Sequence, residues 1–173
     1  MVPTPKPYHP LEINQNPGVS ELERLDRSIF PPGWGLEMYT SLLKGERTHG
    51  WILETVEGNG VGFLCFQRID DEAEVLRIGV LPEHQGKGLG KRLLEGLLAE
   101  MGTHGDGKVF LEVRESNEAA RKLYLSCGFE EAGRREKYYS NPQETAVNYV
   151  WSANISATEQ PKTDQGNSPG KRE

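Results

Sequence analysis

The sequence predicts an α/β fold in which one mixed central sheet of about six to seven strands carries helices on both faces. The first observation is that apolar segments with the period of strands alternate along the chain with segments that have the period of amphipathic helices. The second is the expected element order β-α-α-β-β-β-α-β-α-β-β, which distributes the helices among the strands. The third is the length of 173 residues, which is within the range of a single domain.

Each element is expected from a local pattern of apolar, capping and turn residues. Ser20 and Glu23 have the spacing of a capping box at a helix start, and Pro31 ends that helix. The pair Asn59-Gly60 predicts a tight turn between two strands. The expected strands are Leu11–Asn14, Trp51–Val56, Val61–Phe66, Glu74–Leu81, Lys108–Val113, Phe129–Arg134 and Ala146–Trp151. The expected helices are Ser20–Phe30, Leu36–Leu43, Lys91–Met101 and Glu118–Ser126.

Composition and charge limit the classes of function. The formal net charge of −6 argues against a dedicated nucleic-acid surface and favours a basic partner, such as an amine or a basic peptide. The two cysteines are far apart and the four histidines lack metal-ligand spacing, so we expect neither a disulfide framework nor a metal site. Because the chain has no apolar run long enough to span a bilayer and no signal-peptide core, we expect a cytoplasmic protein that has no membrane partner. Residues 1–10 are expected to be an extended proline-rich leader, residues 11–152 the folded domain, and residues 153–173 a disordered polar tail.

The segment 85–90, Gln-Gly-Lys-Gly-Leu-Gly, follows an apolar strand and opens an amphipathic helix. Such a turn directs backbone N–H groups and the positive end of the helix dipole towards an anion. A P-loop is excluded because no hydroxyl residue follows Lys87, and a dinucleotide fingerprint is excluded because its third glycine comes one residue early. The spacing Q/R-x-x-G-x-G/A does fit, and it resembles the acyl-CoA pyrophosphate loop of the GNAT acetyltransferases. We therefore favour a pyrophosphate site over a merely flexible helix start, with the expected contacts Gly86, Lys87, Gly88, Leu89, Gly90 and Lys91.

The strand that precedes this segment is expected to contact the rest of the carrier. Ile78 and Val80 can offer backbone groups to the pantetheine arm, although core packing is the favoured interpretation of their side chains. Gly79 predicts a bulge or a close backbone approach, and it leaves the main chain open at this point.

Three further residues are candidates for the chemistry of acyl transfer. Glu112 lies between two apolar residues of a strand expected to be covered on both faces, where desolvation raises the pKa of a carboxylate towards that of a useful general base. A solvent-facing Glu112, or one paired with Arg114, is an equally supported alternative. Tyr124 in the next helix can donate a proton to a thiolate, but the pattern alone favours a core aromatic residue with its hydroxyl at the rim. Asn117 is either a helix N-cap or a hydrogen-bonding partner of the carrier.

Separated motifs strengthen this interpretation. Residues 111–124, L-E-V-R-E-S-N-E-A-A-R-K-L-Y, together with residues 127–129 and 134–139, resemble the RimI-type ribosomal-protein-alanine N-acetyltransferases of the GNAT superfamily. The resemblance runs from about Glu74 to Trp151 and is weak before residue 50. It implies that Glu112 is the proton acceptor and Tyr124 the proton donor. It also implies that acetyl-CoA is the cosubstrate, bound by Ile78 to Val80, Gly86 to Lys91 and Asn117.

The chain departs from this family in three respects, one of which is the added polar tail after Ser152. Arg77 stands where the family commonly has asparagine, in the stretch Arg77-Ile78-Gly79-Val80. The region Phe30 to Trp34 resembles the substrate loop of the family only loosely. Arg77 alters the charge beside the strand that is expected to bind the cofactor, and therefore bears on the choice of acceptor.

The resulting hypothesis is transfer of an acetyl group from acetyl-CoA to the N-terminal α-amine of a protein. The resemblance implies that this is the N-terminal alanine of a ribosomal small-subunit protein. We expect a monomer or weak dimer, without direct nucleic-acid contact. One alternative is a GNAT enzyme that acetylates lysine side chains or a small amine. An alternative of another class is a non-catalytic CoA-binding regulatory module, against which the presence of both Glu112 and Tyr124 argues.

Overall fold

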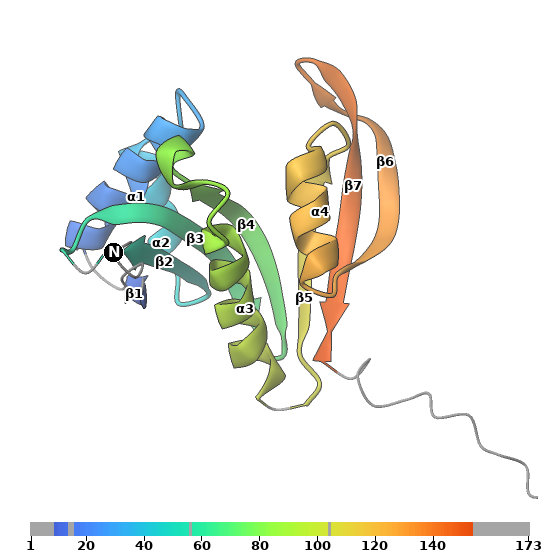
Figure 1. Cartoon of the computed structure of the whole chain (residues 1–173), viewed down its shortest axis with the longest axis horizontal. Coiled ribbons are helices and arrows are strands. Elements are labelled where there is room, and N and C mark those ends of the chain that lie inside the picture. Colours follow the sequence, from blue (N-terminus) through green and yellow to red (C-terminus); the bar gives the residue numbers. More distant parts are fainter. Residues whose placement is uncertain (1–8, 14–15, 56, 104, 154–173) are drawn as a thin grey trace, which may run out of the picture.

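The computed structural model describes residues 9–13, 16–55, 57–103 and 105–153. Within this part of the chain, seven strands form one mixed sheet in the order β1-β2-β3-β4-β5-β7-β6 (Figure 1). The strands are β1 His9–Ile13, β2 Thr48–Glu54, β3 Gly60–Ile69, β4 Glu72–Val80, β5 Lys108–Arg114, β6 Glu130–Ser140 and β7 Gln143–Ser152. The helices are α1 Asn16–Ile29, α2 Leu36–Leu43, α3 Leu89–Gly102 and α4 Glu118–Ser126, with a short 3-10 helix at Pro82–His84. The α/β class and the expected order of elements are confirmed.

The bounds of several elements differ from the prediction. The capping box at Ser20 is wrong, because α1 begins at Asn16 and Val19 already continues the buried stripe of Leu22 and Leu25. A proline in the first turn, here Pro17, is compatible with this earlier start. Residues 9 and 10, assigned to the leader, belong to β1, which pairs with β2. The expected leader segment 1–8 and the tail residues 154–173 lie outside the described residues.

The sheet separates two cores. On one face, α3 and α4 cover a core that contains Leu64, Leu94 and Val109. On the other face, α1 and α2 cover a smaller core that contains Leu22 and Phe63. The helices α1 and α2 contact chiefly β2, β3 and β4, and Figure 1 shows them beside that half of the sheet. No helix in the described part of the chain is long and apolar enough to cross a membrane.

The central strands β4 and β5 separate after a short parallel contact. They pair only at Glu72↔Lys108, Ala73↔Val109 and Glu74↔Phe110, after which β4 continues to Val80 and β5 to Arg114. Figure 1 shows the two strands diverging, with α3 on the β4 side and α4 on the β5 side. The facing backbone edges of β4 and β5 are therefore not paired with each other beyond these positions.

Candidate functional site

The glycine loop lies where β4 leads into α3, at the end of the sheet at which β4 and β5 diverge. Gly86 and Gly88 have φ angles of 72° and 74°, a left-handed conformation that favours glycine. A Cβ atom added at either residue would meet no heavy atom within 4 Å, so both open to free space. Gly88 is the N-cap of α3 and provides no capping side chain, so the first N–H groups of the helix stay available to an anion.

Contacts within the loop and to α4 hold this shape. The Gln85 side chain donates a hydrogen bond from Nε2 to the carbonyl oxygen of Val80 at 3.0 Å, which closes the loop onto the end of β4. Leu89 is buried in the core beneath α3. A Cβ atom at Gly90 would lie 3.2 Å from Cδ2 of Leu123, so glycine here allows α3 and α4 to pack closely. Lys87 and Lys91 add positive charge to the loop and the first turn of α3. Lys87 donates from Nζ to the carbonyl oxygen of Glu83 at 3.2 Å, and Lys91 pairs with Glu95 at 3.7 Å.

The end of β4 presents its unpaired backbone edge to the divergence. The side chains of Ile78 and Val80 pack with the core under α3 and α4, as the core interpretation expected. At Gly79 the expected close approach is present, because a Cβ atom would lie 2.8 Å from Cε2 of Phe30. The bulge lies instead at Leu76, and the open face expected at Gly79 is covered on this side by the loop after α1.

Glu112 lies on β5, on the face away from α3 and α4, since its neighbours Leu111 and Val113 point into that core. Its side chain is 24% exposed, and Oε2 lies 3.6 Å from Nη1 of Arg135 on β6. Arg114, the partner considered from the sequence, instead lies over the Tyr139 ring at 4.0 Å. Glu112 is thus partly desolvated and paired, but with a residue of a strand that is not its neighbour in the sheet.

A cavity of about 500 Å³ opens beside Glu112, on the half of the sheet face that α1 and α2 leave uncovered. Phe110 and Tyr138 give it apolar surface, and Arg135 reaches into it from β6. Its lining also includes Gln67, Ile69, Glu72, Ala73, Glu74, Leu111, Ala132, Asn148 and Tyr149. A carboxylate at such a cavity can take a proton from a cationic amine that enters it.

Tyr124 on α4 is a buried core residue, as the pattern favoured, and its ring packs against Phe129 and Tyr149 at centroid distances of 6.0 and 5.9 Å. Burial, followed by the neighbouring Tyr139 phenol, raises the pKa of Tyr124 to about 12. Burial also raises the pKa of Tyr139, and the Glu112 carboxylate raises it further. Glu112 and Tyr124 approach β5 from opposite faces, and Tyr139 lies within electrostatic reach of both.

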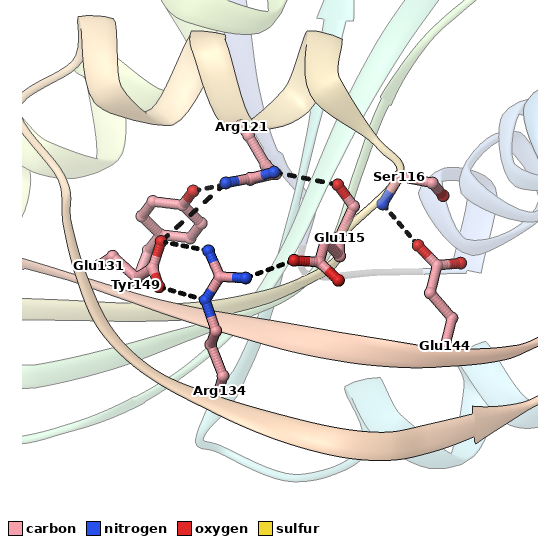
Figure 2. A network of polar contacts seen from close by, with 7 residues as sticks. All are labelled: Glu115, Ser116, Arg121, Glu131, Arg134, Glu144 and Tyr149. Carbon is pink, nitrogen blue, oxygen red and sulfur yellow. Dashed lines mark hydrogen bonds and ion pairs between the residues drawn. The ribbon is translucent and has the colours of Figure 1, made fainter.

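The position of α4 is set by its cap and by a polar network (Figure 2). Asn117 is the N-cap, and its Oδ1 accepts a hydrogen bond from the Ala120 N–H at 3.2 Å, so the capping interpretation is confirmed. Ahead of it, the Ser116 N–H donates to Oε1 of Glu144 on β7 at 2.5 Å. Arg121 donates from Nε to the Tyr149 hydroxyl at 3.1 Å. These contacts tie the start of α4 to β7.

The same network reaches the edge strand β6. Arg134 lies between Glu131 and Glu115, and Figure 2 shows its guanidinium directed at both carboxylates. The hydrogen bond from Arg134 lowers the pKa of Glu131. The segment between β5 and α4 is thereby held against β6, which also carries Arg135 beside Glu112.

Sequence reasoning missed Arg135 and Tyr139 as neighbours of Glu112. Both lie in the stretch 134–139 that carried part of the resemblance, but no local pattern indicated which way they face. A bulge between Arg135 and Tyr139 in β6 changes the alternation of side chains there, with Lys137 at a φ of 53°. The two residues could have been found only with knowledge of this bulge and of the strand order.

Known proteins share both this sequence pattern and this geometry. The model of the acetyltransferase (GNAT) family matches residues 19–129. The [ribosomal protein bS18]-alanine N-acetyltransferase of Escherichia coli K12 is 39% identical over 129 residues, which cover 75% of this chain and 84% of that protein. The crystal structure of the ribosomal-protein-S18-alanine N-acetyltransferase from Escherichia coli superposes with a TM-score of 0.74 and 31% identity, covering 85% of this chain and 96% of that one.

A more distant structure shares the fold alone. Arabidopsis thaliana NAA60, crystallised in complex with acetyl-CoA, superposes with a TM-score of 0.69 at 19% identity, covering 84% of this chain and 99% of that one. The family match extends over more than half of the chain and includes both the glycine loop and the strand of Glu112. The chain therefore belongs to the acetyltransferase (GNAT) family and is an acetyltransferase.

Proposed function

We propose that this enzyme transfers the acetyl group of acetyl-CoA to the N-terminal α-amine of a protein, and that the acceptor is the N-terminal alanine of a ribosomal small-subunit protein. The observation that carries the proposal is the divergence of β4 and β5, with an open glycine loop at its end and a carboxylate beside a cavity on its far side. The likeness to the bS18-alanine N-acetyltransferase of Escherichia coli supports the choice of acceptor.

In this proposal, the residues that bind the cosubstrate and the residue that deprotonates the amine lie on different sides of β5. Backbone N–H groups of residues 86–91 hold the pyrophosphate of the cosubstrate, and the free edge of Ile78 to Val80 pairs with its pantetheine arm. Asn117, at the start of α4, contacts the cosubstrate from the other side of the divergence. The protein thereby places the thioester in the divergence, where an amine from the cavity can reach it.

Two proton transfers accompany the acyl transfer. Glu112 accepts a proton from the acceptor ammonium, and the neutral amine attacks the thioester carbonyl. The resulting tetrahedral species carries a surplus proton on its nitrogen, and this proton is released to solvent as the amide forms. When the C–S bond breaks, the leaving thiolate takes a proton from Tyr124, and the Tyr124 phenolate is reprotonated from solvent. The raised pKa of Tyr124, about 12, keeps the phenol protonated at neutral pH.

The chemistry of the acceptor favours an α-amine over a lysine side chain. An α-amino group has a pKa of roughly 8, so about a tenth of it is neutral at pH 7. A lysine amine with a pKa near 10.4 is neutral only to roughly one part in a few thousand. Deprotonation by a single carboxylate therefore costs less free energy for an N-terminal amine than for a lysine. A ribosomal acceptor places the reaction in the cytoplasm.

The test is to follow thiol release from acetyl-CoA with three acceptors. These are a peptide that begins with alanine, the same peptide with an acetylated N-terminus and an added internal lysine, and spermidine. We expect release with the first acceptor alone. Faster release with the lysine peptide or with spermidine would replace the proposal by the side-chain or small-amine alternative. If the protein binds CoA but releases no thiol with any of the three acceptors, the regulatory-module alternative would replace the proposal.

A further inference from the structure

Asp26 near the end of α1 is a charged side chain with no exposed surface. Its Oδ1 lies 2.6 Å from Nε of Arg77 on β4, an ion pair that is not aligned as a hydrogen bond. Its Oδ2 accepts a hydrogen bond from the Trp34 N–H at 2.7 Å. Because a buried charge without a partner is strongly destabilising, the fully buried Asp26 requires Arg77, whose own side chain is 21% exposed. The pair therefore joins α1, the loop after it and β4 at one point.

Arg77 also holds the loop between α1 and α2 through its flat guanidinium group. Its Cζ atom lies 4.6 Å from the ring centre of Phe30 and 4.5 Å from that of Trp34, at the two ends of the loop. Cations over aromatic faces are attracted to them, and more strongly where water is excluded. The loop packs further against the sheet at Gly79, where Phe30 takes the space that a Cβ atom would need. The shape of the loop thus depends on one side chain from the sheet.

The loop is attached to the part of β4 that lies beyond its last pair with β5. After the last β4–β5 pair, Glu74↔Phe110, Arg77 is the third residue on β4, and one of the three is the bulged Leu76. Glu112 is the second residue after that pair on β5. Arg77 therefore stands level with Glu112. The two lie on the same face of the sheet, because Arg77 shares its face with Cys65 of the α1/α2 core.

We propose that the Arg77–Asp26 pair positions the Phe30–Trp34 loop as the wall of the acceptor site opposite Glu112, so that Arg77 is a positioning residue that sets acceptor affinity. This inference rests on the proposed function for the identity of the acceptor. Arg77 holds the loop by its ion pair with Asp26 and by its contacts with the rings of Phe30 and Trp34. A wall fixed in this way selects among acceptors without touching the thioester.

The variant that tests this is Asp26→Asn combined with Arg77→Met. Removing Arg77 alone would leave a buried unpaired carboxylate and risk loss of the fold. The double variant removes both charges, keeps the oxygen that accepts the Trp34 N–H, and keeps an aliphatic chain between the two rings. We expect KM for the alanine peptide to rise roughly 10- to 100-fold, since small misplacements of binding groups have effects of this order. We expect kcat and KM for acetyl-CoA to stay close to those of the wild type.

The matched control is Arg68→Met, which removes a different arginine of the sheet. Arg68 on β3 pairs with Glu100 on α3 at 2.7 Å, on the opposite face. It should change neither KM. Arg77→Lys keeps the charge but not the flat stack, and should fall between the wild type and the double variant. A wild-type acceptor KM in the double variant, or an equal rise in both KM values, would overturn the inference.

A second readout does not depend on activity. The chain has three tryptophans, so 19F NMR of protein labelled with 5-fluorotryptophan should give three resonances, with Trp34 assigned through Trp34→Phe. In the double variant only the Trp34 resonance should shift, while those of Trp51 and Trp151 stay in place. If no peptide is acetylated by the wild type, the proposed function fails, whereas an unmoved Trp34 resonance refutes the hold of Arg77 on the loop itself.

Discussion

Replacing Gly88 by alanine separates the role of the glycine loop in binding from its role in folding. Gly88 has a φ of 74°, and an added Cβ atom would touch nothing within 4 Å. The cost to the fold is therefore the left-handed backbone alone, about 1–2 kcal/mol for alanine. For a chain of this length that lowers the melting temperature by roughly 2–8 °C. Packing adds nothing to this cost.

The affinity for CoA should fall for a different reason. The added methyl group fills the open space in front of the first turn of α3, where the proposed pyrophosphate lies. Loss of one hydrogen bond to a charged group costs about 1.5–3 kcal/mol. At about 1.4 kcal/mol per factor of ten, the dissociation constant of CoA should rise roughly 10- to 100-fold. Isothermal titration calorimetry with CoA measures this rise directly.

Gly58 provides a matched control for the same substitution. It has a φ of 84° in the turn between β2 and β3, and it also has no heavy atom within 4 Å of an added Cβ. Gly58→Ala should lose a similar free energy of unfolding and leave the affinity for CoA unchanged. If Gly88→Ala binds CoA as the wild type does, or if Gly58→Ala weakens binding equally, the glycine loop does not hold the pyrophosphate.

Three further substitutions test the other parts of the site. Glu112→Gln should lower kcat/KM for the alanine peptide by roughly 10²–10⁴-fold with unchanged CoA affinity, and wild-type turnover in steady-state kinetics would exclude it as the base. Tyr124→Phe tests how the stability of the fold depends on the protonation of Tyr124. Because the folded-state pKa of Tyr124 is raised to about 12, its stabilisation is complete below the ordinary tyrosine pKa near 10 and is lost as pH rises to about 12. The free energy of unfolding of the wild type, measured with urea, should therefore fall by ~2–3 kcal/mol more than that of Tyr124→Phe across this pH range. An equal dependence on pH in the two proteins would contradict the burial argument. Gly79→Ala should destabilise the fold by roughly 1–3 kcal/mol, because its Cβ would lie 2.8 Å from Phe30, whereas Gly133→Ala, with open space, should not.

The fold could be predicted where the signals are local. The bounds of α2 and α4 match their prediction residue for residue, because each helix has a clear apolar stripe and a definite end. The predicted start of α1 is wrong because a capping box is a weak signal, and the buried stripe of the helix extends to the N-terminal side of Ser20. The glycine loop was located because its backbone conformation depends on its own residues, as the positive φ angles of Gly86 and Gly88 show.

The composition of the site could not be predicted in the same way. The pairing of Glu112 with Arg135 depends on β7 lying between β5 and β6, which no local pattern encodes. The pairing of Arg77 with Asp26 depends on a bulge at Leu76 that turns Arg77 towards α1. Both pairings are effects of strand order and register. A sequence can therefore indicate that a charged residue in a strand is unusual, but it does not show which residue pairs with it.

The divergence of β4 and β5 explains how two candidate groups on opposite faces of a sheet can serve one reaction. In a continuously paired sheet, the backbone would separate Glu112 from Tyr124, and a proton acceptor on one face could not act with a donor on the other. Here β5 is not paired with β4 beyond Phe110, so the edge of β5 beside Glu112 is not closed by a β4–β5 hydrogen-bond ladder. In the proposed mechanism, the amine enters from the cavity, the thioester lies along the free edge, and the thiolate leaves towards the phenol. The separation of the strands is thus as necessary to this mechanism as either side chain.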